Sequence, residues 1–180
     1  MESNAVNDSG LTEDDYASVL TAVQSLAGKY GAVWTLNEAL SGWRLVVIGI
    51  EDGFDTSWIW EYHDEFVCRD WLHEAWALLT PRVQQLRLPT LNEWDLRFIA
   101  ATLPMRTTSA APSTTEGRWW HNRYPRRVAG EPGEDLPSQW SPEPINIEGD
   151  QTPAVQQRST ATTATDDGQG CLSKTAGRPV

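Results

Sequence analysis

WRLVVIGIEDGFDTSWIWEYH, from Trp43 to His63, is the most apolar stretch of the chain, and we expect the fold to be built around it. In residues 43–50, apolar side chains occupy both alternating sets of positions. This pattern is typical of a strand that is covered on both faces of its sheet. The first half of the stretch therefore predicts a central β-strand.

The second half of the stretch predicts a turn followed by another strand. Residues 51–55 are acidic and contain Gly53, which can adopt the positive φ that tight turns need. Residues 57–62 alternate so that one face carries only aromatic side chains. Such a face needs helices to cover it, and its members are Trp58, Trp60 and Tyr62.

Before this stretch, the sequence predicts a helix that begins after Thr12 and ends at Gly31. Thr12 and Asp15 have the spacing of a capping box, and glycine commonly ends a helix. Residues 32–37 alternate in a way that favours a strand, although residues 35–40 also suit a helical turn.

After the stretch, the predicted elements are helical. Residues 64–79 have a wide apolar face at helical spacing, and Pro81 suits the first position of a short helical turn. Pro89 should break the chain before a further helix that starts at Thr90 and closes the domain before Pro104.

These elements predict an α+β domain over residues 11–104, with a flexible N-terminus at residues 1–10. The domain has a small antiparallel sheet of two to three strands with helices packed on one face. Residues 105–180 differ in composition, because Pro, Gly, Ser and Thr supply 31 of the last 75 residues. A segment of this composition has few apolar side chains to bury. Their burial cannot offset the entropy cost of ordering the backbone, which predicts a long disordered tail.

Within this tail, residues 118–127 concentrate aromatic and basic side chains. Arginine and aromatic residues carry much of the binding energy at protein interfaces. The cluster could bind an acidic protein surface, single-stranded nucleic acid or an anionic membrane, or it could fold back onto the acidic body of the chain itself. The candidate binding residues are Arg118, Trp119, Trp120, Arg123, Tyr124, Arg126 and Arg127.

Charge and composition limit the classes of function. Residues 1–105 carry 6 Lys and Arg against 16 Asp and Glu, so the body should repel phosphate backbones. Nucleic acid therefore remains a partner only through the tail cluster. The two cysteines do not support a disulfide framework, and no signal peptide or transmembrane segment is apparent, so we expect a cytoplasmic protein.

The ionisable residues at 63–74 are the weak catalytic candidates: His63, Asp64, Glu65 and His73. His73 and Glu74 begin a zincin-like pattern, but Ala77 stands where the second histidine is required. Phosphate-loop, dinucleotide and nucleophile-elbow motifs are also missing, and the surroundings of Cys68 favour a buried apolar role. No metal or cofactor is predicted.

We therefore expect a non-enzymatic protein-interaction module with an unidentified protein partner, in which the tail cluster provides a second or intramolecular contact. One alternative is a small hydrolase or metal-dependent enzyme centred on residues 63–74. Another is a modulator of nucleic-acid processes that acts through the tail. Seven tryptophans in residues 1–105 are more than a small core requires, and an exposed aromatic patch among them would favour the interaction module.

Overall fold

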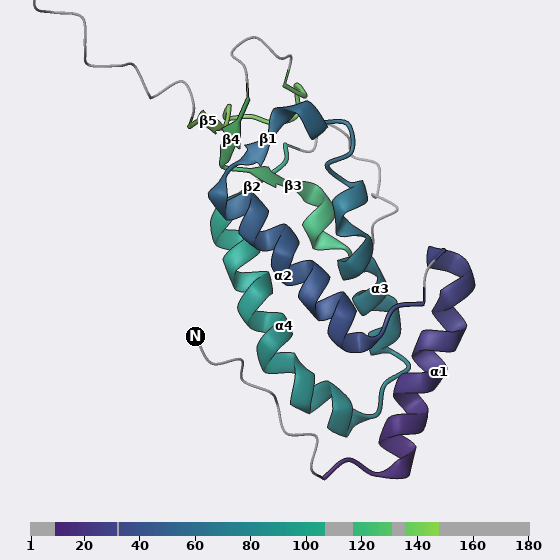
Figure 1. The fold of residues 1–180 in the computed structure, drawn as a ribbon. Helices are drawn as coiled ribbons and strands as arrows, with labels where there is room; N and C mark the ends of the chain where they lie inside the picture. The colour runs from purple at the N-terminus through teal and green to yellow at the C-terminus, as the bar shows by residue number, and fades with distance from the viewer. Residues whose placement is uncertain (1–9, 32, 107–116, 131–135, 148–180) are drawn as a thin grey trace, which may run out of the picture.

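The structure of the chain, a computed structural model, describes residues 10–31, 33–106, 117–130 and 136–147 (Figure 1). These residues form α-helices, short 3-10 helices (η) and short strands in this order: α1 (Glu13–Tyr30), α2 (Leu36–Asp52), β1 (Phe54–Asp55), η1 (Thr56–Trp58), η2 (Asp64–Phe66), α3 (Val67–Trp76), α4 (Pro81–Ala101), β2 (Thr102–Pro104), η3 (Trp119–Asn122), β3 (Arg123–Pro125), β4 (Arg127–Ala129) and β5 (Ile145–Asn146).

Helix α2 is the central element of the fold. It packs against both α3 and α4, while α1 packs on α3 at the outside of the bundle (Figure 1). The short strands gather at the end of the bundle where α2 finishes (Figure 1). They form a parallel three-stranded sheet in the order β1-β4-β5 and an antiparallel pair, β2 and β3. The predicted mixed α+β class is confirmed.

The strands predicted at residues 32–37 and 43–50 are wrong, because most of this sequence belongs to α2. Thr35 accepts a hydrogen bond from the backbone of Glu38, and the Glu38 carboxylate accepts one from the backbone of Thr35. This capping box starts a helix. The buried positions then follow helical spacing: Leu36, Ala39, Leu40, Trp43, Val47 and Ile50.

The strand predicted at residues 57–62 is also wrong, although the turn before it has the predicted Gly53 with a positive φ of 119°. Asp55 accepts a hydrogen bond from the backbone N–H of Ser57 at 2.9 Å and so starts η1 instead. Trp58 and Trp60 are exposed whereas Tyr62 is buried, so the aromatic side chains do not share one face.

The predicted helices outside this stretch are confirmed, with changed bounds. Helix α1 begins with the predicted capping box of Thr12 and Asp15, and Gly31 ends it in a left-handed conformation. The predicted helix at 64–79 consists of η2 followed by α3. The break predicted at Pro89 is wrong, because α4 continues through this proline.

The prediction of a disordered tail is wrong for residues 117–130 and 136–147. Their strands pair with β1 and β2, and four of their side chains belong to the core beside Trp43, Phe66 and Phe98. A large aromatic residue buries about 150–250 Å², so a few of them hold a segment whose overall composition is poor in apolar residues. The four are Trp120, Tyr124, Val128 and Trp140.

The packed region therefore extends beyond the predicted boundary at residue 104. The remaining parts of the predicted tail, at 107–116, 131–135 and 148–180, and the predicted flexible residues 1–9 lie outside the described residues. Within the described part of the chain, no helix combines the length and the apolar character that crossing a membrane requires.

Candidate functional site

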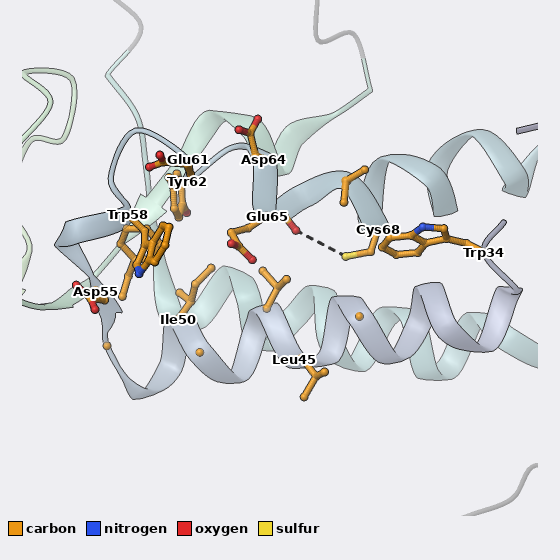
Figure 2. Close-up of a pocket in the computed structure, with 16 residues that line it drawn as sticks. Trp34, Leu45, Ile50, Asp55, Trp58, Glu61, Tyr62, Asp64, Glu65 and Cys68 are labelled. Carbon is orange, nitrogen blue, oxygen red and sulfur yellow. Dashed lines mark hydrogen bonds between the residues drawn. The ribbon is translucent and has the colours of Figure 1, made fainter. Parts of the chain in front are cut away.

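A groove of about 760 Å³ lies between α2 and the loop that carries η1 and η2 (Figure 2). Trp34 and Cys68 close the end near the start of α2, and Asp55 and Trp58 stand at the other end. Most of its exposed surface is contributed by apolar atoms. A concave, mostly apolar surface with a few polar groups is the usual form of a binding site.

Glycines on one side of α2 make the floor of this groove: Gly42, Gly49 and, just past the helix, Gly53. A methyl group at Gly42 would lie 3.2 Å from the Cβ atom of Cys68, so this glycine is needed for packing. A methyl group at Gly49 would meet no atom within 4 Å. The absence of a side chain at Gly49 therefore leaves the helix backbone accessible from the groove.

Gly49→Ala should raise the free energy of unfolding by about 0.5–1 kcal/mol, because alanine favours a helix over glycine. Gly28→Ala in α1 should do the same, since it too has open space. Gly42→Ala should raise the free energy of unfolding by less, or lower it, because the added methyl group would crowd Cys68. Chemical denaturation of the three variants would measure this, and equal effects at Gly42 and Gly49 would contradict the open floor.

The rim of the groove is acidic, and none of the described residues that line it is Lys or Arg. Glu65 reaches from η2 toward α2, whereas Glu61 and Asp64 stand on the outer side of the loop (Figure 2). Hydrogen bonds from the Ser57 hydroxyl and backbone lower the pKa of Asp55 at the end of the groove. This carboxylate is therefore ionised at neutral pH.

Apolar side chains project from both lips of the groove. Leu45 on α2 is 65% exposed and Trp58 in η1 is 59% exposed. Trp60 is 83% exposed and lines a second hollow on the other side of the loop, beside His63 and Trp140. Tyr62 contributes to both hollows, and its buried hydroxyl has no hydrogen-bond partner among the described residues. The predicted surplus of tryptophan is thus visible as two exposed indoles.

The 118–127 cluster lies against the acidic body, mainly through Asp70 on α3. One oxygen of Asp70 accepts hydrogen bonds from Trp120 Nε1 and His121 Nε2, each at 2.9 Å. The other oxygen accepts a hydrogen bond from Arg118 Nη1, also at 2.9 Å. The Nη2 atom of Arg118 donates a further hydrogen bond to Glu74. This one carboxylate therefore holds three neighbouring side chains of the cluster.

Burial alone would raise the pKa of Asp70, but hydrogen bonds from His121 and Trp120 and the charge of Arg118 hold this pKa below its usual value. Glu74 has a lowered pKa as well, since hydrogen bonds from Lys29 and Tyr30 outweigh its burial. Both carboxylates are therefore ionised at neutral pH and can pair with the cationic cluster.

The other candidate binding residues also contact the body. Trp119 packs near Phe98, with ring centroids 5.9 Å apart. Arg123 donates to the hydroxyl of Thr102 at 2.7 Å, and Tyr124 is fully buried. The exposed residues Arg126 and Arg127 donate to backbone carbonyl groups, those of Ala100 and Glu51 respectively.

The four weak catalytic candidates are divided between different surroundings. Asp64 and Glu65 belong to the groove. His63 faces His121 at 5.5 Å between ring centroids, and burial, followed by the charge of His121, lowers its pKa. His73 contacts the ring of Trp120, its centroid 5.5 Å away. The structure does not bring these side chains together.

The geometry of this region gives little support to a nucleophilic cysteine or to a metal site. Burial raises the pKa of Cys68 to about 12, so its thiol stays protonated at neutral pH. Among the described residues, no group of at least three His, Cys, Asp or Glu side chains could hold a metal ion. We compared the chain with protein-family models, with curated proteins and with solved structures. None of the three comparisons found a match.

Sequence reasoning singled out two of the rim carboxylates, Asp64 and Glu65, but missed the floor of the groove. The missing signal was the spacing of Gly42, Gly49 and Gly53, which places small residues on one side of a helix. That signal has meaning only once residues 43–50 are known to be helical. Sequence reasoning also did not identify Asp70 and Glu74 as the carboxylates that bind the basic cluster.

Proposed function

We propose that this chain is a non-enzymatic protein-interaction module that binds a partner protein in the groove between α2 and the η1–η2 loop. The observation that carries this proposal is the combination of an apolar floor with exposed Leu45 and Trp58 on the two lips. A concave, mostly apolar surface is the usual form of a binding site, and tryptophan is enriched where binding energy is concentrated.

The basic-aromatic cluster supports the same proposal by what it contacts. Arg118 and Trp120 bind Asp70, and Tyr124 is fully buried, so these side chains face inward. The cluster then acts as an intramolecular contact that completes the domain. The partner protein would then bind in the groove, which is mostly apolar and larger than the hollow beside Trp60.

Site-specific photo-crosslinking in the full chain tests this proposal. A photoreactive amino acid at Leu45 should form adducts with a partner protein in cells, because this side chain lies on the lip of the groove. The same amino acid at Leu20 is the matched control: Leu20 is also helical and is 56% exposed, but it lies on α1 outside the groove. Filling the floor with Gly49→Trp should remove the Leu45 adducts.

Two results would contradict the proposed function. One is an identical set of adducts from Leu45 and Leu20, which would mean nonspecific contact. The other is the persistence of every Leu45 adduct in the Gly49→Trp protein. A truncation after residue 105 is not a suitable control, because it would remove Trp120, Tyr124 and Trp140 from the core.

A further inference from the structure

The chemistry of the groove specifies what kind of segment it accepts, and this inference rests on the proposed function. We propose that the partner presents a basic amphipathic helix, with two or three apolar side chains toward α2 and with Lys or Arg toward the η1–η2 loop.

The shape follows from the side of α2 that forms the floor. Residues 42–53 span about 16 Å along a helix at 1.5 Å per residue. Apolar side chains of a partner helix recur at every third or fourth position, so this length receives two or three of them. Gly49 has open space above it, so the partner can approach the α2 backbone closely at the middle of the groove.

The backbone groups of the walls favour a helix over an extended peptide. In α2 they are bonded within the helix. In the opposite wall, hydrogen bonds close successive turns from Ile59 to Thr56, from Glu61 to Trp58 and from Asp64 to Glu61. An extended peptide would find few backbone partners here and would leave its own groups unpaired, whereas a helix satisfies its hydrogen bonds internally.

The charge of the walls decides the polar side of the partner. Four acidic residues line the groove, of which Glu65 reaches toward α2 while Glu61 and Asp64 stand on the outer side of the loop, and no described lining residue is Lys or Arg. An acidic segment would meet like charge, and complementary charge contributes specificity and a faster association rate. The four are Asp55, Glu61, Asp64 and Glu65.

Synthetic peptides provide the test with the full chain. The basic probe is a fluorescein-labelled helix of about 16 residues with Leu at helical spacing and Lys elsewhere. A second probe has Glu in place of every Lys, and a third is a shuffled basic peptide without the helical spacing. Fluorescence anisotropy should show that the basic probe binds about tenfold or more tightly than either of the others, and more weakly as salt is raised.

Two pairs of variants locate the binding. Gly49→Trp should weaken the affinity for the basic probe by about tenfold or more. Gly28→Trp, at an equally open helical glycine outside the groove, should change this affinity by less than about twofold. Glu65→Lys should also weaken it, while Glu93→Lys on the exposed side of α4 should have a much smaller effect. Far-UV circular dichroism would verify that all four proteins are folded.

The inference is overturned if the acidic or shuffled probe binds as tightly as the basic one, if no probe binds, or if Gly49→Trp leaves binding unchanged. The proposed function is judged separately by the crosslinks from Leu45. A partner linked there through an acidic or neutral segment would leave the proposed function standing and reject the basic helix. Loss of Leu45-specific adducts would instead reject the proposed function itself.

Discussion

Replacing Trp120 by alanine should lower the free energy of unfolding by about 3–5 kcal/mol, the range for truncating a large buried aromatic residue. Trp120 is fully buried, and its indole N–H donates a hydrogen bond to Asp70 at 2.9 Å. The guanidinium group of Arg69 lies 4.1 Å from the centre of its ring. Alanine would leave a cavity and remove one donor from a partly buried carboxylate. Urea denaturation of the full chain, followed by circular dichroism, would measure the loss.

Trp60→Ala is the matched control for this prediction. Trp60 is 83% exposed, so its replacement should change the free energy of unfolding by less than about 0.5 kcal/mol. If both substitutions had the same small effect, residues 117–130 would not be part of the folded core in solution. A large effect of Trp120→Ala alone would establish that the basic-aromatic cluster is a structural element of the domain.

The error in residues 43–50 has a physical cause that also points to the site. In α2, the buried positions repeat with helical spacing, but Leu45 and Val46 are apolar as well although they line the groove. This excess of apolar side chains made both faces of the segment look buried and so predicted a strand. Two of the residues that misled the prediction, Leu45 and Val46, therefore line the groove in which we propose that the partner binds.

The error in the tail arose from averaging composition over a long segment. Pro, Gly, Ser and Thr dominate residues 106–180 as a whole, yet the core needs only a few large side chains from it. Helices with strong local signals were predictable, as the capping box of Thr12 and Asp15 shows. The contacts of Trp120 and Tyr124 join residues far apart in the chain, and no local pattern reports such contacts.

Asp70→Asn should lower the free energy of unfolding by about 2–3 kcal/mol at pH 7, because hydrogen bonds to a charged group contribute more than neutral ones. The asparagine side chain would keep one acceptor oxygen but lose the charge that pairs with Arg118 and that strengthens the hydrogen bond with His121. Asp52→Asn, at an exposed position at the end of α2, should change stability by less than about 0.5 kcal/mol. Denaturation curves of both variants and the wild type would measure the difference.

The pH dependence of this difference separates the charge of Asp70 from its packing. The pKa of Asp70 is lower in the folded chain than in the unfolded chain, where it is about 3.9. The stabilisation by the ionised carboxylate is therefore fully present above the unfolded pKa and is lost as the pH falls through the folded pKa. The gap between wild type and Asp70→Asn should shrink from about pH 5 downward, since a protonated Asp70 is neutral like asparagine. A gap that stays constant to the lowest pH at which the chain folds would assign the effect to packing and would show that the charge of Asp70 does not hold the basic cluster in place.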